Sequence, residues 1–230
     1  MLILSADTSS AKFSVSITDN LKVIDTFKAK EFNRHSSDLI PEIDKLLTKN
    51  SIDIKDIDAF CVGLGPGSFT GLRIGLTTMR GLSFALSKPI VGIPSIDAIA
   101  INVIEFNDKI SVIIDAKQNK LYHRDYIIKN NKIIPKTKMV LIAREDLIRQ
   151  AKPNTLFIGD GVGLIKSDII DKQKSSKFAL PDLWYPKADI IAMLGFERLK
   201  KRKKDNVFTL NPLYIYPKEC QIRKPKAKKK

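Results

Sequence analysis

The chain contains 230 residues, of which 43% are hydrophobic, and its formal net charge at pH 7 is +15. This length and apolar content suffice for one large domain or two small ones, each with a core. No run of 18 apolar residues occurs, which argues against a membrane-spanning helix. The opening Met-Leu-Ile-Leu-Ser-Ala-Asp indicates a buried first strand and not a secretory signal, which would start with basic residues. Cys61 and Cys220 suggest neither a disulfide framework nor a zinc site, so we expect a cytoplasmic protein.

The excess positive charge lies mostly at the C-terminal end. From Arg198 to Lys230 there are thirteen Lys and Arg residues against two acidic ones, a net +11, which leaves +4 for the rest of the chain. The two densest runs are residues 198–204 and 224–230. Such runs attract polyanions without sequence specificity. We expect residues 218–230 to be a disordered basic tail, which is either simply solvated or draws tRNA toward a larger complex. No aromatic residue follows Tyr216, so base stacking is not expected there.

The first hundred residues predict strands and helices in a mixed order. Apolar and polar residues alternate at 13–17, as in a half-buried strand. Residues 35–49 predict an amphipathic helix whose apolar side consists of Leu39, Ile40, Ile43, Leu46 and Leu47. The expected elements are strands at 2–5, 13–17, 21–27, 59–63 and 90–93, and helices at 35–49 and 71–86.

The order of elements then starts again. Strands are expected at 110–115, 121–128, 132–134, 139–142 and 155–159, and helices at 143–151 and 188–204. Two copies of a βββαβ unit predict a duplicated α/β fold with two packed lobes and a cleft between them. We place the lobes at residues 1–103 and 104–217, with the late helix at about 188–204 packing near the first lobe.

The junction Gly63-Leu64-Gly65-Pro66-Gly67-Ser68-Phe69-Thr70-Gly71 joins a strand to a helix and demands a sharp turn. Ser68 or Thr70 can cap the helix. The junction is not a phosphate loop of the Gly-Lys-Ser/Thr type, because no lysine occurs from Asp56 to Ser87. It also lacks the third glycine of a dinucleotide fingerprint and the spacing of a nucleophile elbow. Three interpretations stay open: tight helix–strand packing, contact of the bare amides with an anion or nucleotide, and a surface for a partner protein.

Several segments together resemble one family. They are Ile3-Leu4-Ser5-Ala6-Asp7-Thr8-Ser9, His35-Ser36 at the start of a helix, the complete motif from Gly65 to Gly75, Ile113-Ile114-Asp115-Ala116-Lys117 with lysine in place of arginine, and Asn211-Pro212-Leu213-Tyr214-Ile215. These matches span residues 2 to 215, and the glycine motif is the most specific of them. The chain is thereby identified as similar to the bacterial TsaB family, also called YeaZ.

The resemblance implies the two-lobed fold of the acetate kinase, sugar kinase, Hsp70 and actin superfamily. It also implies a role in forming N6-threonylcarbamoyladenosine at position 37 of tRNAs that read ANN codons. In that family this subunit is not the catalyst. It binds a related TsaD subunit, which holds the metal and transfers the threonylcarbamoyl group, and a TsaE ATPase joins the complex. Weak binding of ADP or ATP at a subunit boundary is a further expectation, with contacts from Asp7, Thr8, Ser9, Gly67 and Ser68.

The residues themselves also argue against catalysis. Leu39 stands four residues after His35, where the related catalytic subunit carries a second metal-binding histidine, and His123 lies far away. Asp7, Asp115 and Asp160 follow expected strands and could serve as superfamily carboxylates, yet the segment after Asp7 lacks the glycine that lets amides approach phosphate. We therefore expect no catalytic residue, no metal site and no required cofactor. Ser68 as the nucleophile of a peptidase is also not expected, because no histidine lies near it in sequence.

The two helices of the first lobe offer a docking surface. Gly71 and Gly75 lie four apart and let another helix approach closely, and the family pairs these helices with those of its partner. The residues expected to contact the partner are Leu39, Ile43, Leu72, Leu76, Met79, Arg80 and Ser83, although they could instead serve the internal core. Without its partner the chain is expected to form homodimers. Arginine in place of Leu76 or Met79 is expected to break the association without unfolding the chain.

Two other functions stay open. One is an independent small-molecule kinase or ATPase of the same superfamily. The other is general RNA binding by the basic tail.

Overall fold

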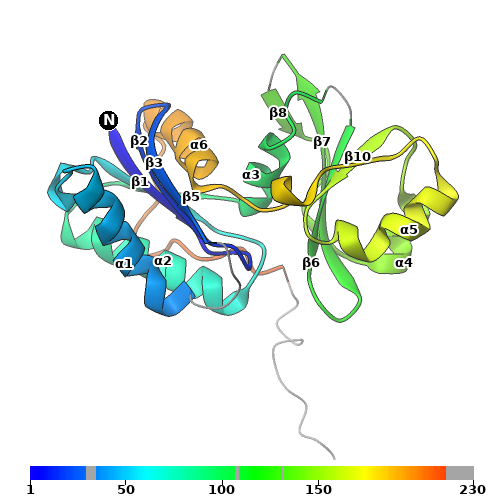
Figure 1. Ribbon diagram of the computed structural model, residues 1–230, viewed down its shortest axis with the longest axis horizontal. Coiled ribbons are helices and arrows are strands. Elements are labelled where there is room, and N and C mark those ends of the chain that lie inside the picture. Colours follow the sequence, from blue (N-terminus) through cyan, green and yellow to red (C-terminus); the bar gives the residue numbers. More distant parts are fainter. Residues whose placement is uncertain (30–34, 107–108, 131, 216–230) are drawn as a thin grey trace, which may run out of the picture.

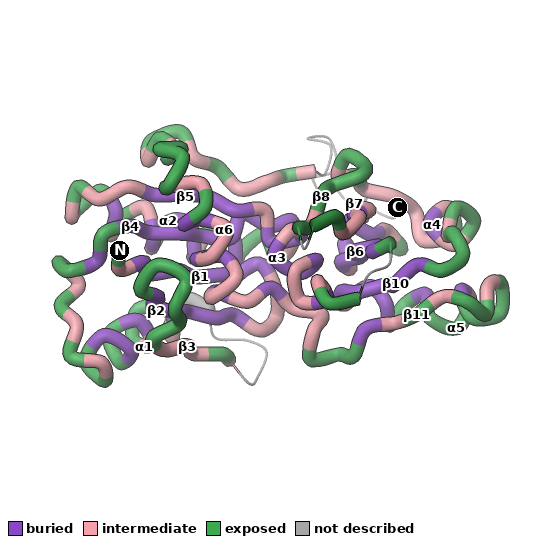
Figure 2. The backbone as a smooth tube through the Cα atoms, turned by 90° about the horizontal axis from the view of Figure 1, so that it is seen from above, coloured by how far each residue is buried: buried purple, intermediate pink, exposed green. Residues whose placement is uncertain are grey.

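The computed structural model describes residues 1–29, 35–106, 109–130 and 132–215, and at residues 35–37 it describes the backbone only. Two β-sheets lie side by side, and helices cover both faces of each (Figure 1). Buried strands form the centre of each lobe, while the loops and helix surfaces at the periphery are exposed (Figure 2). None of the helices in these ranges has the length and apolar character needed to cross a bilayer. The basic tail expected at 218–230 lies outside the described residues.

The first sheet has five strands in the order β3-β2-β1-β4-β5. Strand β2 runs antiparallel to β1 and to β3, whereas β4 is parallel to β1 and to β5. Strand β1 is apolar along most of its length because helices cover both faces of the sheet. The strands are β1 (Leu2–Asp7), β2 (Ser14–Asp19), β3 (Lys22–Lys28), β4 (Ala59–Gly63) and β5 (Ile90–Ile93).

The second sheet repeats this topology in the order β8-β7-β6-β10-β11, with an added strand β9 that also pairs with β7. Strand β7 is antiparallel to β6 and to β8, and β10 is parallel to β6 and to β11. The strands are β6 (Lys109–Asp115), β7 (Lys120–Lys129), β8 (Lys132–Pro135), β9 (Val140–Ala143), β10 (Thr155–Ile158) and β11 (Lys177–Phe178). The predicted duplicated α/β fold is therefore confirmed.

Each sheet has helices on both of its faces. Helices α1 (His35–Lys49) and α2 (Phe69–Ala85) cover one face of the first sheet, and α6 (Ala188–Lys200) covers the other. In the second lobe α4 (Arg144–Gln150) and α5 (Val162–Lys172) lie on one face, and α3 (Ser95–Ile101) lies on the other. Two short 3-10 helices, at Ile54–Asp56 and Pro181–Leu183, complete the connections.

The two lobes exchange a helix. Helix α3 follows the first sheet in sequence, yet Ile96 and Ile99 pack in the same apolar cluster as Ile110 of β6. Helix α6 follows the second lobe, yet Ile191 packs with Ile3 of β1. The helix expected near the first lobe at 188–204 therefore lies on its sheet and ends at residue 200. The expected lobe boundary after residue 103 assigns α3 to the first lobe, whereas its apolar side chains pack in the core of the second lobe.

The remaining differences from the expected elements are local. Helix α2 starts at Phe69, two residues earlier than expected, because Ser68 caps it. The sequence patterns predicted no residue range for three elements, which are helices α3 and α5 and strand β11. Strand β11 is two residues long and is recognisable only through its pairing with β10.

Candidate functional site

The glycine junction is built around the N-terminus of α2. Ser68 is the N-cap, and its Oγ accepts a hydrogen bond from the Gly71 amide at 3.2 Å. Gly65 has a φ of 89°, in the left-handed region that favours glycine. The peptide bond between Gly65 and Pro66 is cis. The capping role that the sequence offered to Ser68 or Thr70 belongs to Ser68.

The glycines of the junction make room for the turn that follows β1. A Cβ atom at Gly67 would lie 2.1 Å from Ser9 O, and one at Gly71 would lie 2.1 Å from Thr8 O. The Ser68 amide donates to Ser9 O at 2.7 Å, so the chain itself satisfies this group at the helix N-terminus. The geometry therefore supports the tight-packing interpretation of the motif: glycine is required because another backbone segment passes in contact with it.

Asp7 lies at the centre of this packing and is fully buried. Its Oδ1 accepts from the amide of Ser9 at 2.9 Å and from its hydroxyl at 2.6 Å. Its Oδ2 accepts from the hydroxyl of Ser95 at 2.6 Å, and Ser95 Oγ in turn accepts from the Gly65 amide. Both oxygens of the carboxyl group are thus engaged within the chain, as a buried polar group requires. Thr8 is also fully buried and donates its hydroxyl to Gly71 O at 2.7 Å.

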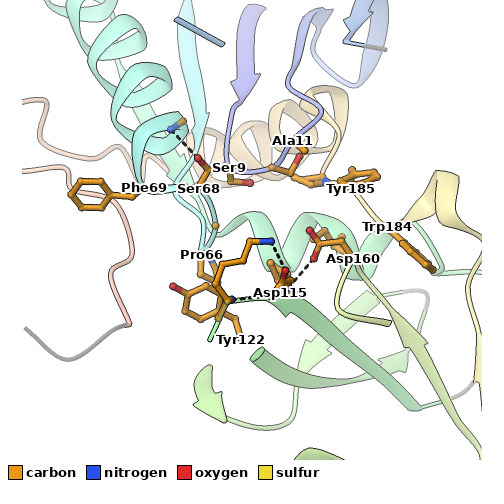
Figure 3. A pocket seen from close by; sticks show the side chains of 18 of the residues that line it. Ser9, Ala11, Pro66, Ser68, Phe69, Asp115, Tyr122, Asp160, Trp184 and Tyr185 are labelled. Carbon is orange, nitrogen blue, oxygen red and sulfur yellow. Dashed lines mark hydrogen bonds and ion pairs between the residues drawn. The ribbon is translucent and has the colours of Figure 1, made fainter. Parts of the chain in front are cut away.

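A cleft of about 570 Å³ separates the two lobes. Ser9 and Ser68 line it from the first lobe, with Tyr185 beside Ala11 on the same side, and Asp115 and Asp160 line it from the second lobe (Figure 3). Of the five residues expected to contact a nucleotide, Ser9, Gly67 and Ser68 line this cleft, whereas Asp7 and Thr8 do not. The two fully buried residues act in the packing below its wall.

The second lobe contributes a hydrogen-bonded acidic pair to the cleft. The Asp115 amide donates to Asp160 Oδ1 at 2.9 Å, and Lys117 Nζ lies 2.5 Å from Asp115 Oδ2. Burial raises the pKa of Asp160, and the nearby negative charge of Asp115 adds to that rise against the backbone hydrogen bonds. The hydrogen bond to Asp115 raises the pKa of Lys117. Anionic phosphate would meet two carboxylates here and one lysine that is already paired.

His123 lies on β7 of the second sheet and does not line the cleft that contains Ser68; it lines a separate pocket of the second lobe. Its Nε2 atom is 2.9 Å from Ser111 Oγ and 2.9 Å from Asp125 Oδ1. A serine–histidine–aspartate relay needs the carboxylate on the opposite ring nitrogen from the serine, so this cluster is not such a relay. The sequence indicated a residue on a sheet face but not this network. Among the described residues no group of His, Cys, Asp and Glu is arranged to hold a metal ion, and the side chain of His35 lies outside them.

Most residues expected to contact a partner are buried in the chain's own core. The six with less than 9% of their surface exposed are Leu39, Ile43, Leu72, Leu76, Met79 and Ser83. Arg80, the seventh, is half-buried and donates to the carbonyls of Phe208 and Leu210. The choice of these side chains as a free surface is therefore corrected: they hold α1 and α2 on the sheet. Arginine in place of Leu76 or Met79 would disrupt that core and not a docking surface alone.

The outward sides of these helices carry different residues. On α2 the exposed positions Arg73, Thr77, Gly81 and Ala85 recur every four residues. A side chain at Gly81 would meet no atom within 4 Å. On α1, Ile40 is 63% exposed. The sequence periodicity identified the buried side of α1 except for Ile40, which was expected on it and instead faces outward. It did not show which glycines of α2 face outward, because Gly71 and Gly75 point to the β1 turn.

The chain is similar to known proteins both in sequence and in fold. A family model described as "TsaD: tRNA N6-adenosine threonylcarbamoyltransferase" matches residues 30–206. The TsaB protein of Buchnera aphidicola subsp. Schizaphis graminum is 32% identical over 87% of this chain and 96% of its own length. The TsaB protein of Bacillus subtilis is 27% identical over 97% of both chains. A tRNA N6-adenosine threonylcarbamoyltransferase of Thermodesulfovibrio yellowstonii is 33% identical, over 42% of this chain and 34% of its own length.

Solved structures share the fold. YeaZ from Pseudomonas aeruginosa superposes with a TM-score of 0.78 at 21% identity, covering 93% of this chain and all of that one. A second structure from that organism, described as similar to peptidase YeaZ, gives 0.79 at 21% identity over 94% and 99%. The activator of 2-hydroxyisocaproyl-CoA dehydratase from Clostridium difficile, solved with bound ADPNP, gives 0.51 at 10% identity over 99% and 100%. These likenesses confirm the two-lobed α/β fold.

Proposed function

Since the chain belongs to the TsaB family of tRNA threonylcarbamoyladenosine biosynthesis proteins, we propose that it is an accessory, non-catalytic subunit of the complex that forms N6-threonylcarbamoyladenosine on tRNA. In this proposal it binds and supports a TsaD-like catalytic subunit. The similarity of part of this chain to a transferase of that kind is consistent with two related folds that pair through equivalent surfaces.

The engagement of Asp7 is the observation that carries the non-catalytic part of the proposal. A carboxylate that holds a metal ion or a phosphate-bound cation must present its oxygens to the cleft. Here both oxygens accept hydrogen bonds from Ser9 and Ser95, and the residue is fully buried. The glycine junction nearby is filled by the chain's own backbone. Both features favour a structural role of this lobe in the complex over a role in phosphoryl transfer.

The outward sides of α1 and α2 supply the docking surface in this proposal. They combine an exposed apolar residue, Ile40, with the small residues Thr77, Gly81 and Ala85 on α2. Small residues allow the axes of two packed helices to approach closely. The buried residues behind them, such as Met79, keep the two helices in fixed positions on the sheet, which reduces the ordering cost of association.

Three further elements of the proposal concern assembly. A TsaE-like ATPase joins the complex, and the chain without its catalytic partner forms a homodimer through the same helices. ADP or ATP binds weakly, at a boundary between subunits. Weak binding agrees with a cleft whose acidic and basic lining residues are Asp115, Asp160 and the paired Lys117.

Reconstitution tests the proposal directly. A TsaD-like subunit, a TsaE-like ATPase, an activated threonylcarbamoyl donor and a tRNA reading an ANN codon are combined with and without this chain, and the modified nucleoside is measured by mass spectrometry. We expect modification to depend on the chain. Equal yields without it would contradict the proposal. Turnover of ATP or a small substrate by the isolated chain, abolished by Asp115→Asn, would favour the independent kinase instead.

A further inference from the structure

A groove of about 780 Å³ lies at the end of the first lobe, outside the interlobe cleft. Three separate segments form it: the C-terminal end of α2 with the turn into β5, the end of α6, and residues 204–208. Its lining combines two aromatic side chains, Phe84 and Phe208, with the basic side chains of Lys88, Arg202 and Lys204. No part of the function proposed above uses these residues.

The two aromatic rings are unusually exposed. Phe84 is 61% exposed and Phe208 is 69% exposed. The rings contact each other edge to face, with centroids 5.5 Å apart and planes at 72°. An edge-to-face contact covers one face of one ring, and the large exposed fractions leave ring surface that a planar ligand can contact. Two large apolar side chains held together in water in this way are typical of a binding surface.

The basic side chains of the groove are not neutralised by neighbouring acids. Asp205, the acidic residue of the lining, is bound instead to Arg198, with an N–O distance of 2.8 Å. Lys88, Arg202 and Lys204 therefore have no carboxylate partner in the part of the chain that the structure describes. Every residue from Lys200 to Lys204 is exposed, so the positive field extends beyond the groove.

Arg202 occupies a backbone position that favours glycine. Its φ is 55°, its amide donates to Leu199 O, and the Lys203 amide donates to Arg198 O. This is the hydrogen-bond pattern that ends many helices, with glycine usually at the left-handed residue. One or two cations would suffice to complement the end of α6. Residues 200–204 are all basic, and one of them, Arg202, occupies the left-handed backbone position. This is more positive charge than is required to complement the C-terminal end of α6.

The walls of the groove are fixed by the fold. The Asp205 amide donates to Ile90 O at 2.9 Å, and its Oδ2 accepts from the Gly92 amide at 2.8 Å. Arg80 donates to Phe208 O at 3.2 Å. These contacts tie the segment that carries Phe208 to the edge strand β5 and to α2. The ring is thus positioned before any ligand arrives, which lowers the cost of binding.

We propose that this groove binds an unpaired nucleotide of the tRNA substrate. The base stacks on Phe208 or Phe84, and the adjoining phosphates lie beside Lys88, Arg202 and Lys204. Stacking rings next to a positively charged groove is the combination that holds unpaired nucleic acid. An apolar peptide would also cover the rings but would bury the three cations without partners, at a high desolvation cost. The inference rests on the proposed function for the identity of the RNA.

Binding of a dye-labelled, ANN-decoding tRNA, measured by fluorescence anisotropy, tests this inference on the full-length chain and on the reconstituted complex. Phe208→Ala is expected to weaken binding about tenfold, and Phe208→Trp to preserve it, because only the second variant retains a stacking surface. The Arg202→Gly/Lys204→Gln double variant is expected to reduce the slope of log affinity against log salt by roughly 1.4, for two lost phosphate contacts. Glycine suits the backbone at 202, so the fold is not compromised.

The matched control is Lys129→Gln/Lys132→Gln, which removes two positive charges from the β7–β8 hairpin of the other lobe. We expect it to leave the salt slope unchanged. Unaltered affinity of Phe208→Ala, or no tRNA binding by the wild-type complex, would overturn the inference. Weaker association of Phe208→Ala with the catalytic subunit, at unchanged tRNA affinity, would assign the groove to a protein partner and also overturn it. Failure of the proposed function is detected by a different experiment. In the reconstitution assay, tRNA modification would then proceed equally well without this chain.

Discussion

Asp7 and Gly63 are so close that a Cβ atom at residue 63 would lie 1.8 Å from Asp7 Oδ2. The two residues end neighbouring parallel strands, β1 and β4. A buried carboxylate therefore takes the space that any other residue at 63 would need for its side chain. The turn that follows β1, at Thr8 and Ser9, likewise leaves no space for side chains at Gly67 and Gly71. The glycine motif and the Asp-Thr-Ser segment thus form one packed unit, which explains why both occur together.

Two glycine substitutions in α2 are expected to act in opposite directions. Gly71→Ala should lower the free energy of unfolding by about 2 kcal/mol, because its Cβ would meet Thr8 O at 2.1 Å and backbone cannot move aside cheaply. Gly81→Ala should raise it by about 0.5–1 kcal/mol, since alanine is the better helix former and no atom lies within 4 Å. Urea denaturation of both variants measures the difference. Equal effects would show that the turn does not pack against α2 as described.

Gly81→Arg is expected to break association with the catalytic subunit while leaving the fold intact. The arginine side chain has room in the isolated chain but would project a charge from the outward side of α2. Size-exclusion chromatography with light scattering and pull-down assays measure the association, and circular dichroism reports the fold. Gly81→Ala serves as the control that adds only a methyl group and no charge. If the arginine variant still forms the complex and the homodimer, the docking surface lies elsewhere.

Ser68→Ala is expected to lower the free energy of unfolding by about 1 kcal/mol without affecting tRNA modification. The variant removes the hydroxyl that caps the Gly71 amide. Ser68→Asp should retain the cap because its carboxylate can accept the same hydrogen bond. A role of Ser68 as a nucleophile would instead predict that both variants lose activity completely. Thermal unfolding and the reconstituted modification assay separate these outcomes.

Asp160→Asn is expected to stabilise the chain at neutral pH. Burial raises the pKa of Asp160, so at pH 7 the ionised carboxylate is less favourable in the folded state than in the unfolded one. Asparagine carries no charge and can still accept the Asp115 amide hydrogen bond. The advantage should shrink as the pH falls through the raised pKa and vanish below about 3.9, the usual value for aspartate, where the wild-type group is neutral in both states. Urea midpoints across this pH range test the sign, and a constant difference would contradict it.

Local patterns predicted most of the secondary structure. Helix α1 and strands β4 and β5 have the bounds expected from periodicity and from the surrounding turn residues. The exceptions are elements with weak local signals. Strand β11 depends on its neighbour β10 for definition. Helix α3 is a short apolar segment that packs against Ile110 of the second lobe. Residues close to it in sequence do not predict this contact.

The candidate site was only partly predictable. The sequence identified the glycine junction, the carboxylates Asp7, Asp115 and Asp160, and the two helices on which we propose the docking surface. It assigned several docking contacts to side chains that the structure buries, such as Leu72 and Met79. An apolar stripe shows that one side of a helix is covered but does not show whether the chain's own sheet or a partner covers it. That distinction depends on contacts between residues far apart in sequence.

The amino-acid sequence by itself determined the repeated order of strands and helices, the place of the sharp junction and the concentration of positive charge near the C-terminus, because each depends on residues close together in the chain. The tertiary structure decided what the junction glycines accommodate, which sides of α1 and α2 face outward, and that Phe84, Arg202 and Phe208 line one groove. Those relationships arise only when β1 meets α2 and when the segment after α6 returns to the edge of the first sheet, since they join surfaces that the sequence keeps apart.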